Sequence, residues 1–286
     1  MRGEHGWHVI AILAMLLVPG LAHAAPQRVV SVSLCTDEYV FRLLPRDRIA
    51  ALSFLSADRH PVVSTIADAV SGIPLVHAST EEVLARRPDL VVIYAGTELR
   101  LQAQLRRAGV AVYDVAWAQS LDDVRTVTRA LGSALGAPAR AEALLAAMDR
   151  QLASRDRLHP SVRTLIYEPN GYATADGVST QVMQAAGLVD VSAQEGVTRA
   201  GTIPVENLVA APPELLLLNG AEKEHPALAD LVLSHPALRG LAGYALVAPV
   251  TLTPLLCPGP WSADVVPMLA RLGREARRLA PAPVRP

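Results

Sequence analysis

Residues 81–92 read EEVLARRPDLVV, and residues 206–217 read ENLVAAPPELLL. Each stretch begins with Glu, has apolar residues at its third and fourth positions, has Pro seven positions after the Glu, and ends in an acidic residue followed by an apolar run. This pattern is typical of a short helix that ends near Pro and leads into a buried strand. The two copies lie 125 positions apart, which indicates two related lobes; chance similarity between short helix-to-strand junctions is the alternative.

Strand and helix patterns alternate on both sides of these stretches. Apolar or β-branched runs predict strands over 28–34, 49–54, 90–94, 110–115, 164–168, 215–219 and 245–250. Helical patterns are expected over 79–86, 99–108, 120–135, 179–186, 205–210, 227–233 and 262–279, and after Cys35 with Thr36 as the cap. Because strands that alternate with helices form parallel sheets, we expect an α/β fold with two Rossmann-like lobes.

One helix is expected to join the two lobes. The segment from Pro138 to Leu158 contains no Gly, begins with Pro and is rich in Ala, Leu, Arg and Glu, so it predicts a single helix of about 20 residues. The expected organisation is a signal peptide at 1–24, an N-terminal lobe at 25–136, a linker helix at 137–159 and a C-terminal lobe at 160–286. A stiff linker of this kind favours small lobe motion.

The N-terminus has the three parts of a secretory signal peptide. Arg2 supplies positive charge, Val9 to Val18 is apolar, and Ala22 to Ala24 gives an A-x-A cleavage site. An uncleaved membrane anchor is the alternative, although the apolar run is short for a bilayer span. We therefore expect an exported protein that works in the periplasm, where disulfides are permitted.

Composition and motifs exclude several classes of function. Hydrophobic residues make up 51% and charged residues 19%, which excludes a disordered chain. The 26 basic residues form no cluster and the net charge is -1, so the sequence does not predict a nucleic-acid binder. The sequence has no serine-nucleophile motif, dinucleotide-binding motif, phosphate-binding loop or pair of His residues spaced for zinc. We therefore expect no enzyme activity, no cofactor and no metal site.

Five segments, in this order, resemble a known family: RVVSVSLCTDE from Arg28, EEVLARRPDLVV from Glu81, YATADGVSTQVMQAAGL from Tyr172, PVENL from Pro204 and PGPWSADVVPMLA from Pro258. Together they resemble the periplasmic substrate-binding proteins of ABC importers for cobalamin, ferric siderophores and haem. The resemblance implies a monomer that captures a metal chelate, either a corrinoid such as cobalamin or a ferric siderophore, and delivers it to an inner-membrane ABC permease dimer. An exported enzyme or an envelope interaction module on the same scaffold is the alternative.

The ligand cleft is expected at the carboxyl ends of the strands, where open α/β sheets bind ligands. Aromatic faces there would suit a flat macrocycle or a catecholate. The resemblance implies that cleft Arg residues meet anionic siderophores, and Arg199 is the best candidate for that role here. Trp261 stands where relatives often carry Arg, which disfavours a highly anionic ligand. The expected ligand-binding residues are Cys35, Thr36, Phe54, Leu55, Tyr94, Gly96 and Trp117 in the first lobe and Tyr172, Arg199, Asn219, Cys257 and Trp261 in the second.

Cys35 and Cys257 are the two cysteines of the chain, and both are expected at the edge of the cleft. Two buried free thiols, a disulfide across the mouth of the cleft, and contact between a thiolate and a metal or ligand are the three alternatives.

Glu81 and Glu206 occupy the same position in the two copies of the opening pattern. The resemblance implies that such acids meet Arg residues on the two permease subunits. The alternative is that each carboxylate only complements the dipole of its helix.

Overall fold

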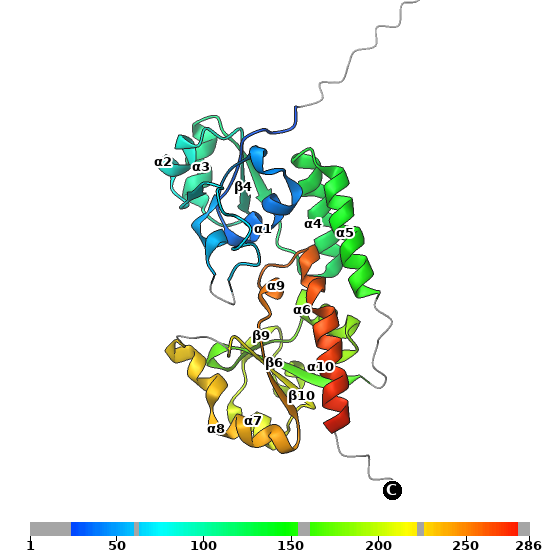
Figure 1. Cartoon of the computed structure of the whole chain (residues 1–286). Helices are drawn as coiled ribbons and strands as arrows, with labels where there is room; N and C mark the ends of the chain where they lie inside the picture. Colours follow the sequence, from blue (N-terminus) through cyan, green and yellow to red (C-terminus); the bar gives the residue numbers. More distant parts are fainter. Residues whose placement is uncertain (1–23, 60–62, 154–160, 222–225, 280–286) are drawn as a thin grey trace, which may run out of the picture.

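The computed structural model describes residues 24–59, 63–153, 161–221 and 226–279. Two α/β lobes lie one above the other, with helices joining them along one side (Figure 1). The prediction of a two-lobed α/β fold is confirmed. The signal peptide expected at 1–24 lies, apart from Ala24, outside the described residues. Among the helices that are described, none is long and apolar enough to span a membrane.

The N-terminal lobe is built on a five-stranded sheet in the order β3-β2-β1-β4-β5, and every neighbouring pair is parallel. Its strands are β1 (Val29–Ser31), β2 (Ile49–Ser53), β3 (Leu75–Val76), β4 (Leu90–Tyr94) and β5 (Ala111–Val115). Its helices are α1 (Leu34–Leu43), α2 (Thr80–Ala85), α3 (Leu99–Arg107) and α4 (Leu121–Ala134). Most buried residues of β1 and β4 are Val or Ile, which suits a sheet covered on both sides.

The C-terminal lobe repeats this plan with a four-stranded parallel sheet in the order β11-β10-β6-β8. Its strands are β6 (Val162–Tyr167), β8 (Leu188–Asp190), β10 (Leu215–Asn219) and β11 (Leu246–Val250). Its helices are α6 (Val178–Ala185), α7 (Val205–Ala210), α8 (Pro236–Gly240), α9 (Thr253–Leu256) and α10 (Val266–Leu279).

Several elements differ from the sequence predictions. The short strands β3 and β8, and the antiparallel pair of β7 (Tyr172–Thr174) and β9 (Ala200–Thr202), were not expected, because runs of two or three residues carry no clear periodicity. A 3-10 helix at Leu228–Ser234 replaces the expected α-helix, and another at Pro260–Val265 precedes α10. Thr36 lies inside α1 and is not its cap, since the helix begins at Leu34.

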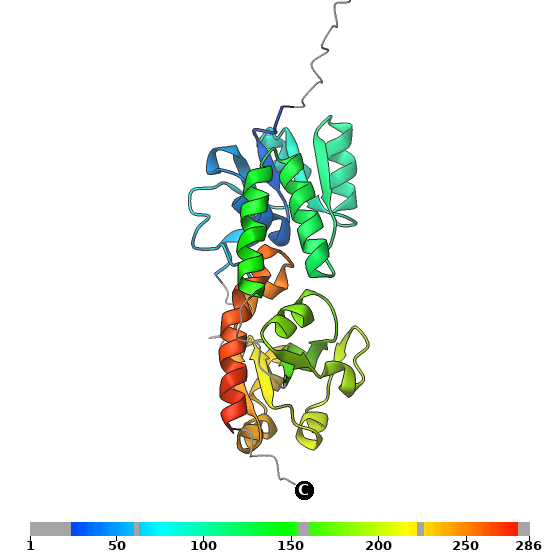
Figure 2. The ribbon, with the colours of Figure 1, turned by 90° about the vertical axis from the view of Figure 1, so that its right-hand side faces the viewer.

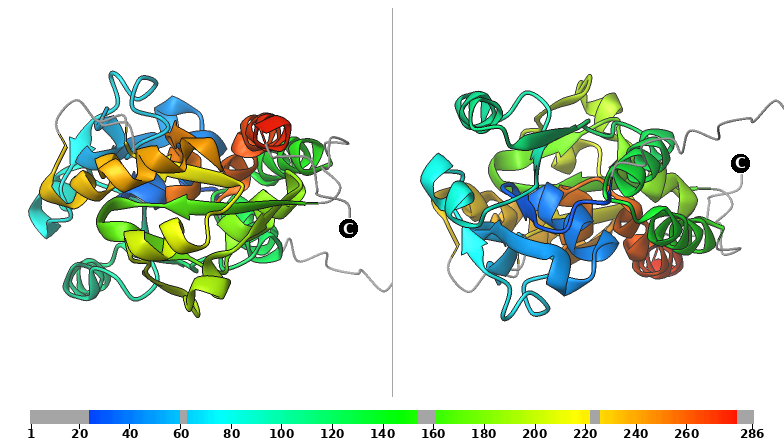
Figure 3. Two further views of the ribbon diagram at one scale, coloured as in Figure 1. Left: turned by 90° about the horizontal axis from the view of Figure 1, so that it is seen from below. Right: turned by 90° about the horizontal axis from the view of Figure 1, so that it is seen from above.

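The linker helix α5 (Pro138–Leu152) ends earlier than Leu158, the end that the sequence predicted. Residues 154–158 of the expected helix lie outside the described residues. Ala141 of α5 packs into the core of the N-terminal lobe, whereas Leu145 and Met148 pack with residues of the C-terminal lobe. The helix therefore belongs to both cores. Figure 2 shows the α4–α5 pair and α10 one above the other along this side, and Figure 3 shows them together when the molecule is seen along its length.

The C-terminal quarter of the chain contributes to the core of the first lobe. Cys257 and Trp261 are buried in the cluster that contains Val29, Tyr39 and Leu43. The ring of Trp261 meets that of Tyr39 edge to face, with 4.7 Å between centroids. The two lobes are thus tied together both through α5 and through this returning segment.

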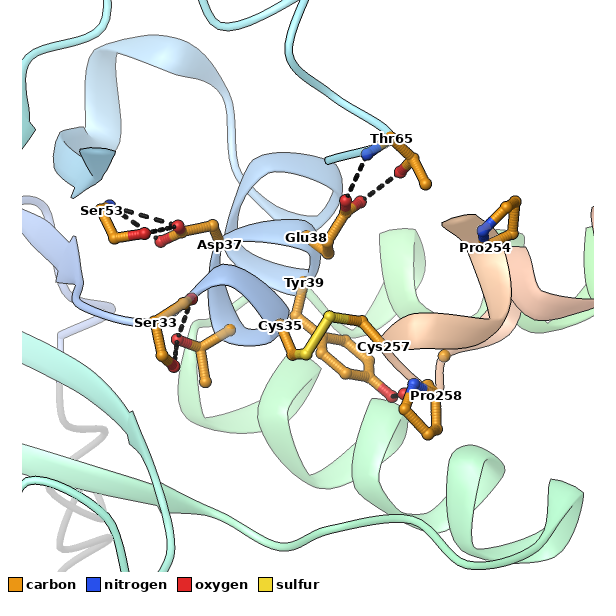
Figure 4. Close-up of a disulfide and its surroundings, with 12 residues drawn as sticks. Ser33, Cys35, Asp37, Glu38, Tyr39, Ser53, Thr65, Pro254, Cys257 and Pro258 are labelled. Carbon is orange, nitrogen blue, oxygen red and sulfur yellow. Dashed lines mark hydrogen bonds between the residues drawn. A yellow bond between two sulfur atoms is a disulfide. The ribbon is translucent and has the colours of Figure 1, made fainter. Parts of the chain in front are cut away.

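A carboxyl group is buried in the first lobe. Asp37 on α1 accepts hydrogen bonds from the backbone nitrogen of Ser53, at 3.1 and 3.2 Å, and from the Ser53 hydroxyl (Figure 4). Burial raises the pKa of the Asp37 carboxyl to about 7, despite these hydrogen bonds. The folded protein therefore holds a proton on Asp37 at pH values where the unfolded chain has lost it.

This proton makes stability depend on pH. Because the pKa of Asp37 is higher in the folded state than the usual value of about 3.9, the free energy of unfolding falls as the pH rises from about 4 to 7. We expect wild-type protein to lose about 2–3 kcal/mol between pH 5 and pH 8, and Asp37→Asn to lose much less. Urea denaturation at the two pH values measures this. Asp122→Asn, at an exposed position on α4, is the control, and an equal pH dependence in wild type and Asp37→Asn would contradict the prediction.

Candidate ligand-binding cavity

A cavity of about 880 Å³ lies at the carboxyl ends of β6 and β10, between the two lobes. The N-terminal lobe contributes the segment that joins β5 to α4. The C-terminal lobe contributes the ends of β6 and β10, the β7–β9 pair, the start of α6 and the segment after β11. Its lining residues are Trp117, Ala118, Gln119, Ile166, Glu168, Pro169, Asn170, Tyr172, Thr174, Asp176, Gly177, Val178, Ser179, Arg199, Thr202, Asn219, Gly220, Leu252, Thr253, Leu255, Leu256 and Pro258.

Two aromatic side chains reach the cavity, one from each lobe. Trp117 follows β5 and is 53% exposed, and Tyr172 begins β7 and is 40% exposed. Tyr94 lies behind Trp117 with 5.3 Å between ring centroids, and burial raises the pKa of its hydroxyl. Tyr94 therefore supports the Trp117 ring and does not line the cavity itself. Large apolar surfaces left open to solvent on both sides of a cavity are typical of a ligand site.

Asn219 links three segments of the cavity wall. Its Nδ2 donates to Glu168 Oε1 at 2.8 Å, and its Oδ1 accepts from the backbone nitrogen of Leu252 at 2.9 Å. One amide therefore joins the ends of β6 and β10 to the segment that follows β11. The Glu168 carboxylate remains at the wall as a hydrogen-bond acceptor for a ligand.

Arg199 lies where the two lobes meet. Its Nη2 donates to Gln119 Oε1 of the first lobe at 3.3 Å, and its Nε lies 3.4 Å from Asp176 Oδ2. All of these groups are exposed, so the ion pair contributes little to stability. The lining therefore carries two carboxylates, Glu168 and Asp176, and a single Arg whose charge is already paired.

The structure brings together four of the expected ligand-binding residues: Trp117, Tyr172, Arg199 and Asn219 line one cavity. The remaining expected residues lie outside its lining. They are Cys35, Thr36, Phe54, Leu55, Tyr94, Gly96, Cys257 and Trp261.

Packing explains where most of these residues lie instead. Thr36 is fully buried and bonds to the hydroxyls of Ser31 and Ser33. The Phe54 ring packs on His77, with 4.6 Å between centroids. The structure joins Cys35 to Cys257 by a disulfide, and Trp261 fills the core of the first lobe.

Sequence reasoning missed several polar lining residues, namely Gln119, Glu168 and Asp176. Glu168 directly follows β6, so the rule that placed Asn219 at a strand end could have found it. Asp176 could not be found in this way, because it follows the unexpected strand β7. Within the described ranges, no group of three or more His, Cys, Asp or Glu side chains is arranged to hold a metal ion.

Glu81 and Glu206 lie outside the cavity, in corresponding places. Glu81 is in the first turn of α2, which leads into β4, and Glu206 is in the first turn of α7, which leads into β10. Both are exposed. In Figure 1, α2 lies near one end of the molecule and α7 near the other.

The chain was compared with known proteins. A family model described as periplasmic binding protein matches residues 56–245. A solved haem-binding periplasmic protein, BhuT with two haems, is 24% identical, with a TM-score of 0.67 over 88% of this chain and 99% of that one. The vitamin B12 binding protein BtuF of Vibrio cholerae is 18% identical, with a TM-score of 0.61 over 89% of this chain and 99% of that one.

A third similar structure is an ABC-type Fe3+-hydroxamate transport system from Saccharomonospora viridis. It is 20% identical, with a TM-score of 0.62 over 87% of this chain and 93% of that one. No curated protein matches the sequence. At these identities the three structures show a shared fold.

Proposed function

Because the chain belongs to the periplasmic binding protein family, we propose that it captures a metal chelate in the cavity between its lobes and delivers it to an inner-membrane ABC permease. Members of this family are solute-binding proteins and not enzymes. The observation that carries the proposal is the pair of exposed aromatic residues, Trp117 and Tyr172, that face one cavity from different lobes.

The lining supports a flat metal macrocycle, of the corrinoid or haem class, over a strongly anionic ferric siderophore. Aromatic rings on two sides offer apolar faces to a planar ligand. A volume of about 880 Å³ lies near the upper end of the range for small-molecule sites, which suits a large ligand. A ligand with several carboxylates or catecholates would meet Glu168 and Asp176, while Arg199 offers one positive charge.

Glu81 and Glu206 are the proposed docking residues for the permease. A protein with one exposed carboxylate on the equivalent helix of each lobe suits a permease made of two related subunits. The placement of these two residues in the first turns of α2 and α7 supports this role.

Removing either cavity aromatic is expected to weaken ligand binding. We expect Trp117→Ala and Tyr172→Ala each to raise the Kd roughly 10- to 100-fold, because each truncates a large aromatic side chain of the cavity lining. Trp117→Phe should have a smaller effect because it keeps an aromatic face. Titration with cyanocobalamin, haemin and ferrichrome, followed by isothermal titration calorimetry, measures the Kd for each class of chelate without relying on the substituted tryptophan.

Matched controls lie outside the cavity lining. Phe54→Ala and Tyr244→Ala remove exposed aromatic side chains that do not line the cavity, so they should leave the Kd unchanged. Failure of all three chelates to bind the wild-type protein would refute the proposed ligand class. Equal losses in the cavity and control variants would refute the proposed site.

A further inference from the structure

A short segment after β11 forms one wall of the cavity, and we refer to residues 252–258 as the wall segment. It contains α9, and its cavity-facing residues are Leu252, Thr253, Leu255, Leu256 and Pro258. Four of these residues are apolar: Leu252, Leu255, Leu256 and Pro258. The position of this segment therefore helps to set the shape of the cavity.

The wall segment is held at its two ends by different lobes. At its start, the backbone nitrogen of Leu252 donates to Asn219 at the end of β10. At its end, Cys257 is bonded to Cys35 on α1, with the two Cα atoms 5.0 Å apart, and the Tyr39 hydroxyl donates to the Pro258 carbonyl at 3.1 Å. Figure 4 shows the disulfide and this hydrogen bond side by side between α1 and the segment.

The residues that follow the wall segment are anchored without the disulfide. Trp261 packs on Tyr39, and the Arg42 guanidinium lies 4.5 Å from the centre of the Trp261 ring. Arg42 is itself paired with the buried Glu38 carboxylate, which also accepts from the backbone nitrogen of Thr65 at 2.9 Å. Loss of the disulfide should therefore leave the two lobes folded and in contact.

Loss of the disulfide nevertheless changes the end of the wall segment. Two sulfur atoms that are no longer bonded separate toward van der Waals distance, roughly 3.5–4 Å for heavy atoms. Cys257 caps the four-residue helix α9, so a displacement there passes directly to Leu255, Leu256 and Pro258. If the wall segment is disordered before binding, ordering it on binding costs free energy and weakens affinity. A wall segment that is already ordered avoids this cost.

We propose that the Cys35–Cys257 disulfide is a positioning element of the ligand cavity, so that high affinity requires the oxidised protein. This inference rests on the proposed function. A dithiol would reverse the state: the Sγ–Sγ bond breaks, each cysteine gains one electron and one proton, and the dithiol is oxidised to its own disulfide. Since thiols stay reduced in the cytoplasm, the chain becomes a tight binder only in an oxidising compartment.

The test compares oxidised protein with Cys35→Ser/Cys257→Ser and with wild type reduced by dithiothreitol. We expect the Kd for cyanocobalamin or haemin to rise about 10-fold at 25 °C, both in the double serine variant and in reduced wild type. Circular dichroism should show that both proteins are still folded. In the ligand-free protein, hydrogen exchange should rise at 252–258 and stay unchanged in β1, β4 and β10. These strands serve as the internal control.

Each outcome decides the matter. The disulfide would only stabilise the fold if the Kd and the hydrogen exchange were equal in oxidised and reduced protein and only the melting temperature fell. Unfolding of the double serine variant and of reduced wild type would also overturn the proposal, because the proposal requires that both lobes stay folded without the disulfide. If oxidised protein binds none of the chelates, the proposed function fails, but the exchange experiment still tests whether the disulfide positions the wall segment.

Discussion

Reversing the charge at Glu81 and Glu206 together is expected to reduce uptake of the ligand at least 10-fold when ligand is limiting, while leaving its Kd unchanged. Both carboxylates are exposed, lie in the first turn of equivalent helices and are not part of the cavity lining. Double replacement by Ala removes the attraction to basic groups on the permease and should impair uptake. Double replacement by Arg adds repulsion and should impair it further.

The control for this prediction carries the same change of charge elsewhere. Asp122 on α4 and Glu275 on α10 are exposed acids, one in each lobe, on the side where the joining helices lie (Figure 2). Asp122→Arg with Glu275→Arg should leave uptake near the wild-type level. Normal uptake by the Glu81→Arg/Glu206→Arg variant would show that the two acids only complement their helix dipoles, a contribution of about 0.3–1 kcal/mol each.

Trp261→Ala is expected to lower the free energy of unfolding by about 3–5 kcal/mol, the usual cost of removing a large buried aromatic side chain. The indole packs edge to face on Tyr39 and under Arg42, and Gly259 lies so close that a Cβ there would be 2.4 Å from the ring. The indole is therefore enclosed on several sides, and the surrounding residues can move little to fill the space that its removal leaves.

Trp261→Phe separates packing from hydrogen bonding. The Trp261 Nε1 has no hydrogen-bond partner among the described residues, so Phe loses volume but no hydrogen bond. We expect Phe to cost about a third of the effect of Ala, measured as the shift of the urea midpoint at constant slope. A loss as large with Phe as with Ala would mean that the indole nitrogen makes an essential contact. A loss below 1 kcal/mol with Ala would contradict the packing argument.

Local patterns in the sequence were enough to predict the alternation of strands and helices and the equivalence of α2 and α7. The periodicity of apolar residues and the positions of Pro report on these features directly. The strand-end rule placed Trp117, Tyr172 and Asn219 at the cavity, because each lies at or soon after the carboxyl end of a predicted strand. Arg199 was placed there by the family resemblance alone.

Long-range packing accounts for what the sequence could not predict. Trp261 follows the last strand of the second lobe, where the strand-end rule expects a ligand contact, but it packs into the first lobe against Tyr39. Tyr94 ends β4 as expected, but the ring of Trp117 covers it. No local pattern reveals which of two neighbouring aromatic side chains faces a ligand and which supports the other.

The return of the chain to the first lobe has a consequence for how the protein is made. The strands of the N-terminal lobe are complete once Val115 has emerged, yet its core lacks Trp261 and Cys257 until the last tenth or so of the sequence has followed. A chain that emerges N-terminus first therefore reaches the full stability of this lobe only when its last part has been made.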